Sequence, residues 1–286
     1  MGDWERNLLD TSRGAFEIFI KGKGAPMCVT HLYSVFNQTG DYFAEAFTST
    51  HQVFLVNLRE TGYSEKAKEP YQLSMLEAIF DLEAIRKELG IVKWGFAGHS
   101  TGGMLGVIYG IYYSESLNFN VIVGAAAREY MTFSKDCIYN SEHPKFDRMQ
   151  ELNEALKRKD LLLKEKNELK IERTKMSLLA PEKYDELFSL NIHKGLSAIR
   201  MNFFSRELQV YDVTRKLELI STPSLIICGR YDVQCPLMYS VEMVESIPNS
   251  KLVIFEQSSH YPFLEEKEKF INVFDSFIKD DQLLVK

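Results

Sequence analysis

The stretch from Val92 to Met104 constrains the fold of this chain more than any other. An extended apolar run ends at Ala97, the pentapeptide Gly98-His99-Ser100-Thr101-Gly102 follows, and a second apolar run with helical character comes next. This is the G-x-S-x-G pattern in a strand–turn–helix setting. So sharp a turn is expected to strain the serine backbone, and side chains two residues to either side of the serine would collide. The pattern therefore predicts a tight elbow between a strand and a helix.

An elbow of this kind would expose the Ser100 hydroxyl at the N-terminus of the helix. The backbone N–H of Thr101 would point at negative charge on a bound oxygen atom, helped by the helix dipole. The pentapeptide alone fits an ordinary turn equally well. A serine nucleophile also needs a base and an acid that orients the base. In this setting they follow the serine in the order Asp or Glu, then His.

The composition narrows the class of protein. A length of 286 residues suits one large α/β domain, or such a domain with an insert. The net charge of −6 argues against a nucleic acid partner, which needs a basic face. No C-x-x-C pair and no run of membrane-spanning length occurs, and the region 1–10 lacks a signal peptide pattern. We therefore expect a cytoplasmic protein without a metal, a cofactor or a membrane partner.

Strand-like and helical segments alternate on both sides of a charged stretch. The composition changes at about Arg128, and from Glu142 to Lys175 the chain is dense in charge with leucines at helical spacing. Strands resume at Pro223. We predict an α/β fold in which helices flank a mostly parallel sheet. Residues 1–127 and 218–286 would form the core, and residues 128–217 a helical cap.

An acid and a histidine follow the two strands after the insert. Asp232 ends the run Gly229-Arg230-Tyr231-Asp232, and His260 lies in Ser259-His260-Tyr261-Pro262. Loops after parallel strands meet at one edge of the sheet. Either residue could serve only its loop, but the chain order favours a triad of Ser100, Asp232 and His260. We expect His99 to be a packed elbow residue, and place three other histidines at the surface: His51, His143 and His193.

These motifs give the chain its resemblance to α/β-hydrolases with a helical cap. The region 59–64 also resembles the family's Arg-x-x-Gly-x-Ser loop. Among the subfamilies the chain resembles the proline iminopeptidase-like group, through Tyr211-Asp212-Val213 and an acid loop that continues to Pro236. The likeness implies a serine hydrolase that needs no cofactor.

Two motifs depart from the proline iminopeptidase pattern. The family's His-Gly-Gly-Pro-Gly loop is replaced by His31-Leu32-Tyr33-Ser34, and its Gly-Gly-Ser-Trp-Gly elbow by Gly-His-Ser-Thr-Gly. By position, the resemblance makes the N–H of Tyr33 the second oxyanion donor, beside the N–H of Thr101. Leu32 stands where the family has glycine.

Several functions remain open at this point. The first is hydrolysis of a small ester or amide through an acyl-enzyme, and a lactone is a related substrate. The second is a proline iminopeptidase-like aminopeptidase acting on a short peptide. That activity would need buried acids in the cap, and the candidates are Glu142, Glu151, Glu154, Glu182, Asp185 and Glu186. The third is a non-catalytic binding protein with the same fold. The oligomeric state is not indicated.

Overall fold

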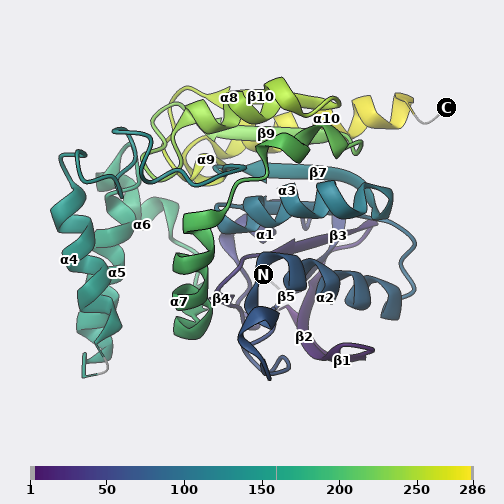
Figure 1. The fold of residues 1–286 in the computed structure, drawn as a ribbon, viewed down its shortest axis with the longest axis horizontal. Helices are drawn as coiled ribbons and strands as arrows, with labels where there is room; N and C mark the ends of the chain where they lie inside the picture. The colour runs from purple at the N-terminus through teal and green to yellow at the C-terminus, as the bar shows by residue number, and fades with distance from the viewer. Residues whose placement is uncertain (1–3, 159, 285–286) are drawn as a thin grey trace.

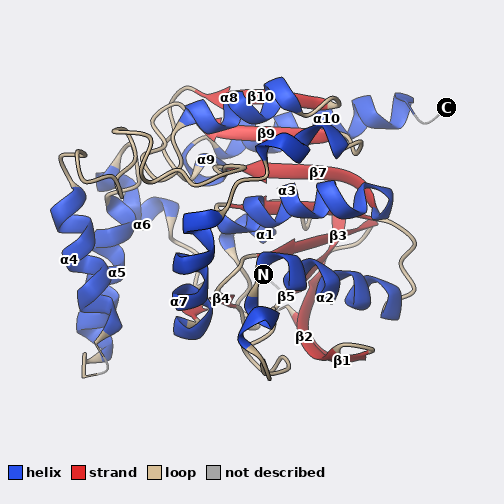
Figure 2. Ribbon diagram, viewed as in Figure 1, coloured by secondary structure: helices blue, strands red, loops and turns tan. Residues whose placement is uncertain are grey.

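The structure is a computed structural model that describes residues 4–158 and 160–284 (Figures 1 and 2). The strands are β1 (Glu5–Thr11), β2 (Gly14–Lys21), β3 (Ala25–Thr30), β4 (Ser34–Val35), β5 (His51–Val56), β6 (Trp94–His99), β7 (Leu117–Val123), β8 (Gly195–Leu196), β9 (Ser224–Gly229) and β10 (Ser250–Phe255). The helices are α1 (Tyr42–Glu45), α2 (Met75–Glu88), α3 (Thr101–Tyr113), α4 (Phe146–Lys157), α5 (Leu163–Lys175), α6 (Tyr184–Leu187), α7 (Ala198–Glu207), α8 (Leu237–Ser246), α9 (Pro262–Glu265) and α10 (Lys267–Leu284).

Eight of the described strands form one sheet in the order β1-β2-β5-β3-β6-β7-β9-β10. From β5 to β10 every neighbouring pair is parallel, while β2 runs antiparallel to both β1 and β5. Parallel neighbours need crossover connections, which the helices supply. The mostly parallel sheet flanked by helices is confirmed.

The two faces of the sheet bury different sets of side chains. Neighbouring strand residues point to opposite faces, so Phe96 packs with α2, α3 and α8, while Ala97 packs with α1 and α10. On the second face the phenylalanines of α1 and of the turn after it meet those of α10 edge to face. Phe47 in this turn and Phe274 of α10, for example, lie 4.8 Å apart between ring centroids. Because helices pack on both faces of the sheet, the strand ends that carry the candidate site are held in place.

The segment between β7 and β9 holds α4, α5, α6 and α7, and Figure 1 shows them at one end of the sheet, with α4 beside α5. Its two ends meet, because Arg128 and Asp212 form a β-bridge and the N–H of Val213 donates to the carbonyl of Ala127 at 2.8 Å. It also touches the core, since β8 pairs with β4. The division into a core and a cap at residues 128–217 stays a prediction.

Two expectations were wrong. The spacing of Phe270, Phe274 and Phe277 in the sequence predicts one closing helix from Phe263 to Ile278. That helix is broken at Glu266, whose backbone leaves the helical region and whose carboxylate binds the loop at Gln257 and Ser258. His51 lies in the core rather than at the surface, because it starts β5 beneath α10 and is only 4% exposed. In the part of the chain that the structure describes, every helix is too short or too polar to span a membrane.

Candidate active site

Ser100 sits in the predicted elbow between β6 and α3. Its φ of 57° and ψ of −123° lie in a strained region for a residue with a side chain. A Cβ at Gly98 would lie 2.0 Å from the carbonyl oxygen of Gly102, so only glycine fits there. The N–H of Ser100 donates to the carbonyl of Val123 at 2.8 Å, which ties the elbow to the end of β7.

Asp232 and His260 form a buried pair. His260 Nδ1 lies 2.9 and 3.0 Å from the two carboxylate oxygens of Asp232, and the two residues are 2% and 3% exposed. Asp232 Oδ1 also accepts the backbone N–H groups of Gln234 and Cys235, each at 2.9 Å. An ionised carboxylate only accepts, so Nδ1 carries the hydrogen and Nε2 is left as an acceptor. This is the tautomer that a general base requires.

Close packing brings the elbow and this pair together. Gly124 follows Val123, and a Cβ there would lie 2.9 Å from Asp232 Oδ2 and 3.3 Å from His260 Nδ1. His99 approaches from the other side, where its Nε2–H donates to the carbonyl of His260 at 2.7 Å. The structure therefore gathers Ser100, Asp232 and His260 at one edge of the sheet.

His99 packs as expected, and it also supports the loop of His260. The two imidazole rings lie 4.5 Å apart, and the rings of Phe263 and Tyr261 lie at 5.0 and 5.4 Å. Burial lowers the pKa of His99 well below its ordinary value, and His260 lowers it further. The His99 ring is thus neutral near pH 7 and acts as a hydrogen-bond donor to the backbone.

Two backbone amides could receive an oxyanion. Thr101 is the first residue of α3, where an N–H has no partner within the helix. Tyr33 lies in the loop after β3, and its ring meets that of His31 edge to face at 4.6 Å. His31 Nε2 lies 3.1 Å from Thr101 Oγ1 and so joins this loop to the elbow. In the described residues neither the Thr101 N–H nor the Tyr33 N–H donates to a protein acceptor.

Arg200 of α7 holds the loop of Tyr33 from the side of the insert. The side chain is 1% exposed, and it donates to three backbone carbonyls: those of Leu32, Arg59 and Leu73. Next to it, the N–H of Ser197 donates to the carbonyl of Tyr33 at 2.9 Å. Burial lowers the pKa of Arg200 to about 10, so the guanidinium stays charged at neutral pH.

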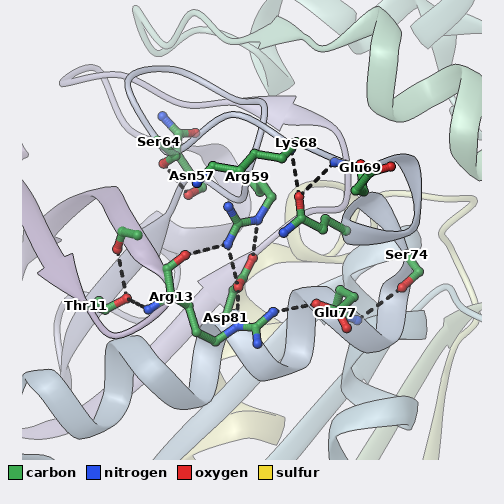
Figure 3. Close-up of polar contacts among 12 residues, drawn as sticks. Thr11, Arg13, Asn57, Arg59, Ser64, Lys68, Glu69, Ser74, Glu77 and Asp81 are labelled. Carbon is green, nitrogen blue, oxygen red and sulfur yellow. Dashed lines mark hydrogen bonds and ion pairs between the residues drawn. The ribbon is translucent and has the colours of Figure 1, made fainter.

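The loop of Arg59 is also held by contacts with α2 and with Arg13, which Figure 3 shows. The Arg59 side chain binds both carboxylate oxygens of Asp81 on α2, at 3.0 and 3.1 Å, and donates to the carbonyl of Arg13. Arg13 in turn binds Asp81 at 2.6 Å. The Arg-x-x-Gly-x-Ser loop is therefore a support that presents the Arg59 carbonyl to Arg200.

An enclosed cavity of about 100 Å³ lies beside this edge of the sheet. His31, His99 and Tyr261 line it, together with two residues of the insert, Phe188 and Lys194. The cavity thus touches a neighbour of Ser100 and a neighbour of His260. Its volume suits a small group rather than a large ligand.

Sequence reasoning missed Arg173 on α5 and Arg200. Arg173 Nε donates to Asn153 Oδ1 at 2.9 Å, and Nη2 donates to the hydroxyl of Tyr139 at 3.3 Å. Arg173 lies in a highly charged run, where nothing marks one cation as turned inward. For Arg200 the one signal is a lone charge in an otherwise uncharged stretch, Ser197 to Ser205.

Comparison with known proteins agrees with this geometry. A family model described as the alpha/beta hydrolase fold matches residues 24–267. A proline iminopeptidase of Clostridioides difficile is 28% identical over 239 residues, covering 80% of this chain and 81% of that protein. A pimeloyl-[acyl-carrier protein] methyl ester esterase of Legionella pneumophila is 23% identical over 259 residues, covering 90% and 97%.

The structure is also similar to that of an alpha/beta fold family hydrolase from Bacillus anthracis, with a TM-score of 0.92 and 44% identity. That match covers 98% of this chain and 99% of the other. The predicted resemblance to α/β-hydrolases, proline iminopeptidases among them, is confirmed. Because the family match spans most of the sequence, the chain belongs to the alpha/beta hydrolase fold family.

Proposed function

We propose that the protein is a serine hydrolase that cleaves a small ester or amide through an acyl-enzyme. Ser100 is the nucleophile, His260 the general base, and Asp232 the acid that orients the imidazole. His260 Nε2 takes the proton from the hydroxyl as Ser100 Oγ attacks the carbonyl carbon. The same nitrogen then gives the proton to the leaving group, and a water molecule activated by His260 releases the acyl group.

The Thr101 and Tyr33 amides bind the oxyanion in this proposal. Both N–H groups lack a partner within the described chain, and both belong to segments fixed by other contacts. Donors held in place beforehand stabilise negative charge as it develops and need no rearrangement. Loss of one such donor costs about 10²- to 10³-fold in kcat in serine hydrolases of known mechanism.

One observation carries the proposal, the buried pair of Asp232 and His260 beside a strained Ser100. A strained backbone and a buried carboxylate both cost stability, so a fold retains them where they have a use. A non-catalytic binding protein of this family would have no need of the three groups together. The geometry therefore favours the enzyme over the binding protein.

Labelling with a fluorophosphonate probe tests the proposal directly. The probe reacts with a serine only when its hydroxyl is activated, so wild-type protein should be labelled at one site, identified as Ser100 by peptide mass. Ser100→Ala should remain folded and unlabelled, and Ser205→Ala, at an exposed position on α7, is the matched control. Absence of labelling in folded wild-type protein would refute the serine mechanism.

The insert bears on the choice between an ester or amide substrate and a peptide substrate. An aminopeptidase needs buried acids to hold a free α-amine, but all six acids considered for this role are exposed: Glu142, Glu151, Glu154, Glu182, Asp185 and Glu186. This favours the small ester or amide over the N-terminal residue of a peptide. A panel of p-nitrophenyl esters beside aminoacyl p-nitroanilides, proline included, separates the two.

Residues 128–217 act as the cap in this proposal. The carbonyl of Ser177 accepts the N–H of His260 at 3.2 Å, and the carbonyl of Tyr33 accepts the N–H of Ser197. The insert thereby contacts both loops that carry the proposed chemistry. It would exclude water from the acyl-enzyme and select the substrate by shape.

A further inference from the structure

Arg173 has hydrogen-bonding capacity that the protein leaves unused. A guanidinium has five N–H donors, and the two hydrogen bonds of Arg173, to Asn153 and Tyr139, both go to neutral groups. Among the described residues no carboxylate lies within ion-pair distance of it. The acid beside it in the chain, Glu172, binds Arg148 at 2.7 Å instead. The residue as a whole keeps part of its surface exposed.

Contacts on α5 and its C-terminal turn connect Arg173 to the candidate site. Ser177 follows Arg173 by four residues, hence on the same side of a helical turn, and its carbonyl binds the N–H of His260. On the other side, the hydroxyl of Tyr139 donates to Gln234 Oε1 at 2.9 Å. The backbone N–H of Gln234 binds Asp232. Two residues, Tyr139 and Gln234, thus connect Arg173 to Asp232, the proposed orienting acid.

The positive charge of Arg173 shifts the pKa values of residues that lie beside the proposed catalytic groups. Burial raises the pKa of Tyr33 to about 12, and Arg173 opposes that rise. Burial likewise raises the pKa of Tyr261, again opposed by Arg173. Burial lowers the pKa of His31, and Lys194, His260 and Arg173 lower it further. Arg173 therefore contributes positive charge beside the proposed site, in a chain whose net charge is −6.

We propose that the free edge of Arg173 binds a carboxylate of the substrate, so that the site prefers a small acyl compound carrying a negative charge. This inference rests on the proposed hydrolase activity and names its substrate class. Two parallel N–H groups of a guanidinium match the two oxygens of a carboxylate. The phenols of Tyr33, Tyr139 and Tyr261 lie near the guanidinium, and a pair formed among them would be stronger than one in bulk water.

The same charge acts against a free α-amine. A substrate ammonium group near Arg173 would meet a like charge in a partly buried site, which is unfavourable. If Arg173 served only to tie α5 to α4 through Asn153, its loss would not change which substrates the enzyme prefers. A change in the preference for charged over neutral substrates therefore distinguishes ligand binding by Arg173 from a structural role.

Two pairs of matched esters test the proposal. The first compares mono-p-nitrophenyl glutarate with p-nitrophenyl pentanoate, which places the charge in the acyl part. The second compares 4-carboxyphenyl butanoate with 4-methoxycarbonylphenyl butanoate, which places it in the leaving group. For each pair the ratio of kcat/KM, charged over neutral, is measured in wild-type protein, Arg173→Gln, Arg173→Lys and Arg206→Gln. The ratio cancels any loss of folded enzyme because both esters meet the same preparation.

We expect the ratio to fall by about ten- to one hundredfold in Arg173→Gln for one of the two pairs. Arg173→Lys should retain part of the preference for the charged ester, because the positive charge remains while the planar, two-pronged guanidinium is lost. Arg206→Gln removes an exposed charge from α7 and should leave the ratio unchanged. Ratios in Arg173→Gln equal to those of wild-type protein for both pairs would overturn the proposal.

A binding measurement keeps this outcome separate from the proposed catalysis. Glutarate is titrated by calorimetry against Ser100→Ala, with and without Arg173→Gln. An affinity lowered about tenfold by Arg173→Gln supports the anion site even if no ester is turned over. Equal affinity, or no binding, counts against it. Fluorophosphonate labelling of wild-type protein without any charge preference would overturn the anion site alone.

Discussion

Arg200 Nε donates a hydrogen bond to the carbonyl oxygen of Leu32, and this carbonyl belongs to the same peptide unit as the N–H of Tyr33. A peptide unit is planar and its N–H points opposite to its C=O. Fixing the carbonyl of Leu32 on one side therefore fixes the direction of the Tyr33 N–H on the other. The residue that does so comes from α7 in the insert, while the loop comes from the core. The position of the insert and the aim of the proposed oxyanion donor are thus coupled.

The first prediction follows from this coupling. Arg200→Lys keeps the charge but can reach fewer of the three carbonyls, so the Tyr33 amide should lose its fixed direction. We expect kcat for an ester to fall by about tenfold or more, with KM less affected, because the amide acts on the transition state. Arg200→Ala should also lose about 3 kcal/mol of stability, because buried carbonyls lose their partner.

Steady-state kinetics and urea denaturation check this prediction. Arg206→Lys, an exposed position on the same helix, is the control and should match wild-type protein in both measurements. A folded Arg200→Lys variant with unchanged kcat would contradict the role assigned to the Leu32–Tyr33 peptide.

The second prediction concerns the tautomer of His260. Asp232→Asn preserves the size of the side chain and an oxygen that accepts the Gln234 and Cys235 amides. Its amide group would donate to Nδ1 and leave the hydrogen on Nε2, where the base must be free. We expect kcat to fall by about 10⁴-fold with little change in fold. Circular dichroism and ester turnover measure the two effects, and turnover within tenfold of wild-type protein would remove Asp232 as the orienting acid.

The elbow and the pairing of Asp232 with His260 could be predicted from the sequence because their rules are local, while the catalytic triad stays a prediction. The Gly98 requirement depends on atoms four residues away, and Asp232 and His260 need only to follow strands of one parallel sheet. Arg200 could not be found in this way, since its three carbonyl partners come from distant loops. A charged side chain on a helix is normally solvent-facing, and only the packed fold shows the exception.

The position of His51 was misjudged for the same physical reason. A histidine between polar residues gives no local sign of burial, but α10 returns from the far end of the chain and covers it with Phe274. The break at Glu266 likewise depends on a tertiary contact, because the carboxylate leaves the helix to bind Ser258 Oγ at 2.7 Å. Helical periodicity continues through that position and predicts no break.

The third prediction concerns the pH dependence of stability. Burial lowers the pKa of both His31 and His99 well below the ordinary value of 6.5, and unfolding restores that value. Below pH 6.5 the unfolded chain therefore binds more protons than the folded chain, and the free energy of unfolding falls as the pH drops toward about pH 5. Above about pH 7.5 these two groups are neutral in both states and contribute almost no slope.

Urea denaturation between about pH 5 and pH 7.5 measures this slope. In His99→Gln the side-chain amide can still donate to the carbonyl of His260, but one titrating group is gone. The slope below pH 6.5 should therefore be smaller than in wild-type protein, while His193→Gln, at an exposed position, should keep the full slope. An unchanged slope in His99→Gln would mean that the burial of His99 does not govern its protonation.

The fourth prediction tests the elbow through its glycine. In Gly98→Ala the new methyl group would lie 2.0 Å from the carbonyl oxygen of Gly102, a backbone atom that cannot turn aside as a side chain can. The turn must open, at a cost of about 2 to 3 kcal/mol, and Ser100 must leave its strained conformation. In the proposed mechanism that conformation presents the hydroxyl to His260, so fluorophosphonate labelling should slow by about tenfold or more.

Gly195→Ala supplies the matched control for the same chemical change. The nearest atom to a Cβ at Gly195 is Cβ of Val35 at 3.4 Å, an ordinary contact. This variant should keep its stability within about 1 kcal/mol and be labelled at the wild-type rate. If Gly98→Ala behaved in the same way as Gly195→Ala, the elbow would be able to relax without displacing Ser100. The strain at Ser100 would then be a consequence of packing rather than the means by which the nucleophile is held.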